Sequence, residues 1–118
     1  MANLTKQKVL LTGLNPTFAS AAGGGDEIVD NDGNTFLYVK NGGGSSINVT
    51  ITSVKTSLDV VGYGEALTLS DEVIAVPAGE ERAIGPFPKV RFDDTDENVA
   101  IAYSDVTSVT VAAIQLVT

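Results

Sequence analysis

The chain of 118 residues contains no cysteine and no histidine, and both absences restrict its chemistry. Without cysteine it can form neither a disulfide nor a thiolate metal site. Without histidine it lacks the commonest general base and metal ligand, so ordinary nucleophile triads and most zinc sites cannot be assembled. Catalysis by a pair of carboxylates, as in glycosidases, is kept as an alternative because fifteen acidic residues are present. These acids, however, cluster in turn-like segments. We therefore expect a protein that is not an enzyme, with no catalytic residues, no cofactor and no metal.

Tryptophan is also absent, and the aromatic residues are only three tyrosines and four phenylalanines. Tyr38 and Tyr103 fall inside apolar segments, which favours a place in the core with the hydroxyl reaching a partner at its edge. Phe87 is likewise assigned to the core. Only Tyr63, which stands between two glycines, is expected to expose its ring. A carbohydrate-binding module needs an exposed aromatic platform, so this class is kept only as an alternative.

Long hydrophobic runs are missing too. No segment approaches the roughly 20 apolar residues that span a membrane. The apolar stretch at residues 9–11 is too short for a signal peptide, and Gly13 and Pro16 follow at once. We therefore expect no membrane partner and a protein that stays where it is made.

Positive charge is scarce, because seven basic residues face fifteen acidic ones and give a net charge of −8. Residues 61–118 alone hold three basic and ten acidic residues. A chain this acidic repels the phosphate backbone, so we expect no nucleic-acid partner. The acidic side chains either form a solvated face that keeps the protein soluble or complement a basic patch on a partner.

Short apolar segments recur between glycine, proline, asparagine and aspartate, and no segment of eleven residues shows helical spacing. The segments expected to be strands are residues 8–12, 35–41, 46–54, 57–61, 66–69, 72–76, 81–84, 89–92, 98–103 and 108–117. Their number and spacing predict an all-β fold, an antiparallel β-sandwich or jelly roll with an extended N-terminal arm. We expect the arm at residues 1–22 and a single β-sandwich domain at residues 23–118.

Residues 35–41 and 47–52 carry the clearest strand signal, and a glycine-rich stretch at residues 41–46 joins them. This combination predicts a β-hairpin. Residues 99–103 are apolar on both faces, which is typical of a central strand. In the last strand the apolar phase changes at residues 112–113, which indicates either a bulge or burial of both faces.

Two acidic turns, at residues 30–34 and 94–98, raise the question of a metal site. The second begins like an EF-hand loop with Asp105 at the twelfth position, but Val99 occupies the position that requires glycine and no helices flank it. Both segments are therefore expected to be polar turns whose Asp and Asn side chains bond their own backbone.

The first 22 residues have too few apolar side chains for a core of their own, and Gly13 and Pro16 interrupt them. We expect this segment to order against a neighbouring subunit or another protein partner; the alternative is that residues 8–12 form an edge strand of the same domain. The residues expected to bind a partner are Leu4, Lys6, Lys8, Val9, Leu10 and Phe18.

Three parts of the sequence together resemble small phage and prophage virion proteins. These parts are residues 31–42, residues 76–80 with 84–88, and residues 99–105 with 110–114. Proteins of this group are acidic, cysteine-free β-domains encoded among head and connector components, and the resemblance spans residues 15–117. The group has no catalytic residues.

The resemblance implies a head decoration (cement) protein that binds the outer surface of the mature phage capsid and stabilises it. Its partners would be the major capsid protein and further copies of itself, with a homotrimer favoured. Its place would be the virion surface, after synthesis and assembly in the host cytoplasm. The alternatives are a neck, tail-terminator or tail-decorating virion protein and, in another class, a carbohydrate-binding or adhesin β-module.

Overall fold

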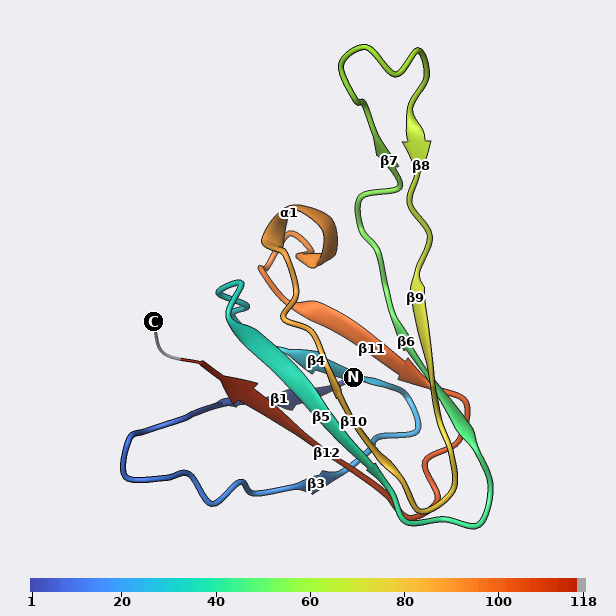
Figure 1. Cartoon of the computed structure of the whole chain (residues 1–118). Coiled ribbons are helices and arrows are strands. Elements are labelled where there is room, and N and C mark those ends of the chain that lie inside the picture. The colour runs from blue at the N-terminus through green and yellow to red at the C-terminus, as the bar shows by residue number, and fades with distance from the viewer. Residues whose placement is uncertain (117–118) are drawn as a thin grey trace.

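Strands form almost all of the regular structure, as the sequence predicts (Figure 1). The computed structural model describes residues 1–116, in which strands β1 to β12 are accompanied by one helical turn, α1 (Lys89–Phe92). The all-β class is therefore confirmed. Within the described residues, no helix has the length and apolar character needed to cross a membrane.

The strands lie in two larger sheets and one short ribbon. The first sheet has the order β1-β4-β11-β6-β9, with strands at Ala2–Leu4, Asp26–Ile28, Val99–Tyr103, Ile47–Ile51 and Glu72–Val76. The second sheet has the order β10-β5-β12-β2, with β3 also paired to β12, and its strands are Glu81–Ile84, Thr35–Asn41, Val109–Gln115, Lys6–Lys8 and Ala19–Ser20. The ribbon consists of β7 (Ser57–Leu58) and β8 (Leu67–Thr68).

Side chains from both sheets meet in one hydrophobic core. Every second residue of β5 and β6 is buried, and the inward set includes Leu37 and Val39 from the second sheet and Val49 and Ile51 from the first. In β6 this period of two follows from the alternating sequence, whereas in β5, where residues 36–39 are all apolar, it follows from the geometry of the strand. β11 lies between β4 and β6, so the prediction of a central strand is confirmed.

The last strand, β12, pairs with β5 without interruption from Val109 to Gln115. Ala112, Ala113 and Ile114 are all buried. The change of apolar phase therefore reflects burial on both faces of β12 and not a bulge. The strand was expected to reach Val117, which lies outside the described residues.

The glycine-rich segment after β5 is a corner between the two sheets, so the predicted hairpin is wrong. β5 pairs with β10 and β12, whereas β6 pairs with β9 and β11. A Cβ atom at Gly43 would lie 2.9 Å from the carbonyl oxygen of Thr107, which explains the need for glycine. At the same corner the buried side-chain amide of Asn41 donates to the carbonyls of Ser45 and Val76, at 2.8 and 3.0 Å. The chain crosses here from the second sheet to the first.

The N-terminal residues contribute a strand to each sheet. β1 pairs in parallel with β4, and after Thr5 the strand β2 pairs in parallel with β12. The sheets are therefore mixed, and the purely antiparallel arrangement expected from the sequence is corrected at these two pairings. Residues 2–8 are edge strands of the domain, whereas residues 9–17 form a loop outside the sheets before β3 begins.

The segment Lys89–Phe92 was expected to be a strand and is instead the helical turn α1. The backbone amides of Phe92 and Asp93 donate to the carbonyls of Pro88 and Lys89, both at 3.1 Å. Lys89 also pairs with Asp93 at 2.7 Å, one helical turn away. Phe87 and Phe92 are buried and pack edge to face, with ring centroids 5.7 Å apart. Four residues that alternate between basic and apolar fit one helical turn as well as a strand, so the sequence pattern does not distinguish the two.

Candidate functional site

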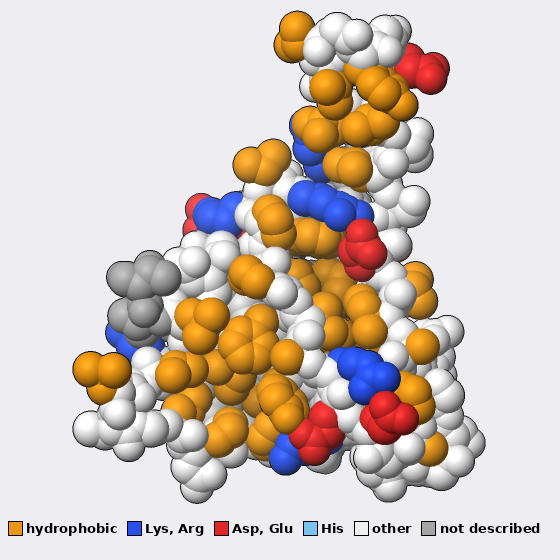
Figure 2. Space-filling model, viewed as in Figure 1, with side chains coloured by type: hydrophobic (Ala, Val, Ile, Leu, Met, Phe, Trp, Pro, Cys, Tyr) orange, Lys and Arg blue, Asp and Glu red, His pale blue; other side chains and the backbone are white. Residues whose placement is uncertain are grey.

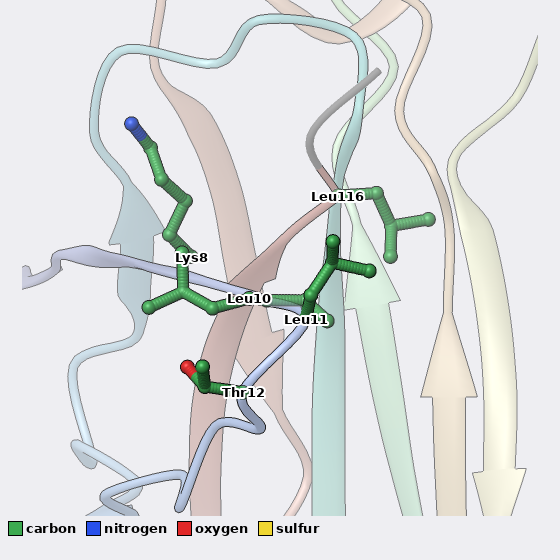
Figure 3. A pocket seen from close by; sticks show the side chains of 6 residues that line it. Lys8, Leu10, Leu11, Thr12 and Leu116 are labelled. Atoms are coloured by element: carbon green, nitrogen blue, oxygen red, sulfur yellow. The ribbon is translucent and has the colours of Figure 1, made fainter.

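Residues 9–17 leave the second sheet as a loop whose two ends are tied together. The side-chain amide of Gln7 donates to the carbonyl of Thr17, and the backbone amide of Thr17 donates back to Gln7, both at 2.8 Å. Leu10 is 53% exposed and Leu11 is fully exposed. An open pocket of about 820 Å³ lies here, and we call it the loop pocket (Figure 3). Its lining residues are Lys8, Val9, Leu10, Leu11, Thr12 and Leu116.

Three of the six residues predicted to bind a partner line the loop pocket: Lys8, Val9 and Leu10. The other three lie elsewhere. Leu4 is buried in the core, and Lys6 pairs with Asp30 at 3.4 Å, so both side chains make contacts within the domain. Phe18 lies over the second sheet. The structure therefore brings together only half of the predicted set.

Apolar side chains gather over the outer face of the second sheet (Figure 2). Phe36 and Tyr38 alternate with the buried residues of β5 and point outward, each partly exposed. Phe18 packs edge to face on Tyr38 with ring centroids 5.5 Å apart, and the Lys40 ammonium lies 4.1 Å from the Phe18 centroid. Ala83, opposite Tyr38, is exposed. We call this surface the sheet face; its residues are Phe18, Phe36, Tyr38 and Ala83.

A long hairpin stands off the body between β6 and β9 (Figure 1). We call residues 53–71 the arm, which is a different segment from the N-terminal arm expected at residues 1–22. Its middle is the β7-β8 ribbon, where Leu58 lies opposite Leu67. Its exposed large apolar side chains are Val54, Leu58, Val60, Val61, Tyr63 and Leu67. An isolated two-stranded ribbon is only marginally stable in water, and clustered exposed apolar side chains mark interaction surfaces. The arm is therefore a candidate binding surface that the sequence analysis missed.

The base of the arm is fixed by α1. The Arg91 guanidinium donates to the Ser53 hydroxyl at 3.1 Å, to the Ser70 carbonyl at 2.7 Å and to the Glu72 carboxylate at 2.9 Å. The Arg91 carbonyl in turn accepts a hydrogen bond from the backbone amide of Val54 at 2.9 Å. Both strands of the arm are thus bound to one residue. Because charge-assisted hydrogen bonds are the stronger kind, Arg91 gives the arm a fixed direction.

Tyr103 and Tyr63 lie where the sequence predicts, whereas Tyr38, expected in the core, is half-buried and points outward because it alternates with the buried residues of β5. Tyr103 packs against the core, and its hydroxyl donates to the Asp26 carboxylate at 2.7 Å. Burial raises the pKa of Tyr103, and this hydrogen bond raises it further, so the phenol stays protonated and acts as a donor. Tyr38 donates to Glu81 at the sheet edge. Tyr63 is 57% exposed, which confirms it as an exposed ring.

The acidic segment at residues 94–98 is a polar turn, as predicted. The Asp94 carboxylate accepts hydrogen bonds from the backbone amides of Asp96 and Asn98, at 2.8 and 3.0 Å. Asp105 lies beyond the other end of β11, a strand about 16 Å long at the usual rise per residue, so it does not close a loop with Asp94. Within residues 1–116, no three acidic side chains form a group that could hold a metal ion.

The other acidic turn is organised around Asp32. Its carboxylate accepts hydrogen bonds from the Asn34 backbone amide, the Thr35 hydroxyl and the Gln115 side-chain amide. Burial raises the pKa of Asp32, but these hydrogen bonds, together with the charge of Lys6, outweigh burial and lower the pKa to about 2. The ionised carboxylate therefore ties the turn before β5 to the end of β12.

This arrangement predicts a loss of stability in acid. The folded-state pKa of Asp32 lies below the value of about 3.9 for an unfolded chain, so its contribution is complete above that value and is lost as the pH falls toward 2. We expect Asp32→Asn to lower the free energy of unfolding at pH 7 by about 1 kcal/mol, allowing for solvent screening. Urea unfolding from pH 7 to pH 2 should show this difference shrinking; a constant difference would contradict the assignment. Asp96→Asn, at an exposed position, is the control at pH 7.

Comparison of the chain with family models, with curated proteins and with solved structures gives no match. Inferences about function therefore rest on the uncovered surfaces of the described residues and on the resemblance of the sequence motifs. The loop pocket, the sheet face and the arm each expose apolar side chains.

Proposed function

We propose that this protein is a head decoration protein of a tailed phage, a structural component without enzymatic activity that binds the outer surface of the mature capsid. The observation that carries the proposal is the apolar surface left uncovered outside a complete core, on the sheet face, the loop pocket and the arm. Apolar patches of this kind mark protein–protein contacts in soluble proteins. The acidic, cysteine-free composition and the three motifs support the same assignment.

The proposed architecture is a β-sandwich whose layers are the two mixed sheets. Residues of both sheets meet in one core, which supports this arrangement. A sandwich has two outer faces, and the outward positions of the second sheet are the more aromatic. We therefore propose that the sheet face lies on the major capsid protein, while the narrow projections at the ends of the domain contact other copies in a homotrimer.

Stabilisation of the head follows from mass action. A protein that binds the assembled lattice but not dissociated subunits shifts the equilibrium toward the assembled lattice. No chemical step is required, because the free energy comes from burial of the sheet face and its polar rim. The rim includes Lys40 and Glu81, which lie opposite each other on β5 and β10.

The test uses phage heads assembled without this chain. Purified protein is added to the heads, the heads are sedimented, and the protein that sediments with them is measured. We expect the protein to co-sediment and Ala83→Arg to weaken binding by at least about tenfold, because it places a long charged side chain beside Tyr38 on the sheet face. Ala102→Arg is the matched control, since Ala102 is an exposed alanine pointing outward from the first sheet.

Failure of the unaltered chain to bind heads would overturn the assignment as a decoration protein. Binding to isolated necks or tails instead would favour the alternative virion role. Binding to a glycan array that is lost in Tyr63→Ala would favour the carbohydrate-binding alternative, because Tyr63 is the exposed ring of the arm. Equal binding by Ala83→Arg and Ala102→Arg would show that another surface meets the capsid.

A further inference from the structure

Two elements of the fold expose apolar side chains that residues 1–116 leave uncovered. At the end of the arm, Val60 and Tyr63 are 42% and 57% exposed, and Val61 is fully exposed. In the loop pocket, Leu10 and Leu11 line an open hollow of about 820 Å³. One element is a projection and the other a recess, so their shapes are complementary.

The arm and the loop of residues 9–17 extend from opposite ends of the molecule in Figure 1. Arg91 holds the base of the arm pointing away from the body. The arm therefore cannot reach the loop pocket of its own chain. A second copy can supply the missing partner for each.

The charges of the two elements are also complementary. The arm holds one lysine and three acidic residues, and two of these acids, Asp59 and Glu65, flank its apolar end. Acidic and apolar side chains lie together near the end of the arm in Figure 2. The loop pocket has Lys8 in its wall.

Four of the seven basic residues form ion pairs within the described chain: Lys6, Arg82, Lys89 and Arg91. Lys8 forms none with residues 1–116, so its ammonium is available to an acidic partner.

We infer that the end of the arm of one copy binds the loop pocket of a second copy. Val60, Val61 and Tyr63 enter the hollow beside Leu10 and Leu11, and Glu65 or Asp59 meets Lys8. We place the two surfaces on different neighbours, head to tail, so that each copy uses its arm on one neighbour and its pocket on another. Such contacts either close into a ring, which fits a homotrimer, or continue as a chain. The inference rests on the proposed self-association and is independent of capsid binding.

The experiment measures the mass of the full-length protein in solution by analytical ultracentrifugation, between about 1 and 100 µM. We expect the unaltered chain to associate. We expect Val61→Asp and Leu11→Asp each to raise the dissociation constant by at least about tenfold, because a carboxylate enters the apolar contact. Both positions are fully exposed, so the melting temperatures should be unchanged. Val90→Asp is the control, since Val90 is 79% exposed on α1 and lies outside both elements.

Mixing the two variants distinguishes an arm-to-pocket contact from an arm-to-arm or pocket-to-pocket contact. Val61→Asp keeps an intact pocket and Leu11→Asp keeps an intact arm, so equal amounts should form a heterodimer although each alone is monomeric. A charge exchange gives a second readout: Lys8→Glu and Glu65→Lys should each weaken association, and the double variant should restore it.

A monomeric unaltered chain at the highest concentration would overturn the inference, as would association of Val61→Asp or Leu11→Asp at the strength of the unaltered chain. A mixture that stays monomeric would also overturn it. Capsid binding by the sheet face is measured separately through Ala83→Arg, so failure of self-association and failure of the proposed function give different results.

Discussion

Replacing Gly25 with alanine is expected to lower the free energy of unfolding by about 3–4 kcal/mol, because two costs combine at this position. Gly25 has a φ of +93°, a conformation that residues with a side chain rarely adopt. A Cβ atom here would also lie 2.7 Å from the carbonyl oxygen of Ile101, in the middle of the first sheet. The backbone cannot easily move away, since Gly25 accepts a hydrogen bond from Ala2 and precedes the β4 residue that pairs with Ile101.

The matched control is Gly24→Ala, at the preceding position. A Cβ atom at Gly24 would have no neighbouring atom within 4 Å, and its φ is not positive, so this substitution should change stability by less than about 0.5 kcal/mol. Thermal unfolding should separate the two proteins by about 10–20 °C, given the usual relation between stability and melting temperature in small domains. Equal melting temperatures would show that β4 and β11 are not held as closely as the structure indicates.

The sequence predicts the strands well because a period of two is a local property. Alternation in residues 47–51 marks which side chains enter the core, and the structure buries that set. Residues 36–39 are all apolar, so the sequence alone does not determine which side of β5 faces inward, and the expectation of Tyr38 in the core is wrong. Alternation also does not say which strands are neighbours. The glycine run between β5 and β6 looks like a hairpin loop in sequence, but the approach of Gly43 to Thr107 makes it a crossing between sheets. That approach depends on a segment more than sixty residues away, which no local pattern contains.

The candidate surfaces are predictable only in part, because a local pattern does not show which segments cover one another. Val9 and Leu10 are expected to bind a partner because the apolar residues of this segment are sparse and interrupted, and the structure exposes both. The strand expected at residues 8–12 is wrong, because β2 ends at Lys8. The arm looks like ordinary strands in sequence, since residues 57–61 and 66–69 alternate as sheet strands do. Alternation shows that one side of a ribbon is apolar, but only the tertiary structure shows whether another sheet covers that side. The role of α1 is hidden likewise, because Arg91 contacts residues on both sides of the arm that are about 20 and 40 positions away.

Replacing Asn41 with aspartate should be nearly as destabilising as the change at Gly25, by about 3 kcal/mol at pH 7. The side chain is 2% exposed and spans the corner between the sheets. Its amide donates to the carbonyls of Ser45 and Val76, and its oxygen accepts from the backbone amide of Gly43 at 3.0 Å. Aspartate has nearly the same shape but no donor when ionised, so a buried charge would face two carbonyl oxygens.

The change at Asn41 carries its own pH dependence, which distinguishes it from a packing defect. Burial beside carbonyl oxygens raises the pKa of the introduced carboxyl in the folded state, so the deficit relative to the unaltered chain should shrink as the pH is lowered from 7 toward 4. Asn48→Asp is the control, because it adds the same charge at an exposed position of β6. Its cost should stay below about 0.5 kcal/mol at pH 7. Urea unfolding at both pH values provides the measurement. A deficit in Asn41→Asp that is small, or that grows in acid, would mean that the amide does not join the two sheets at this corner.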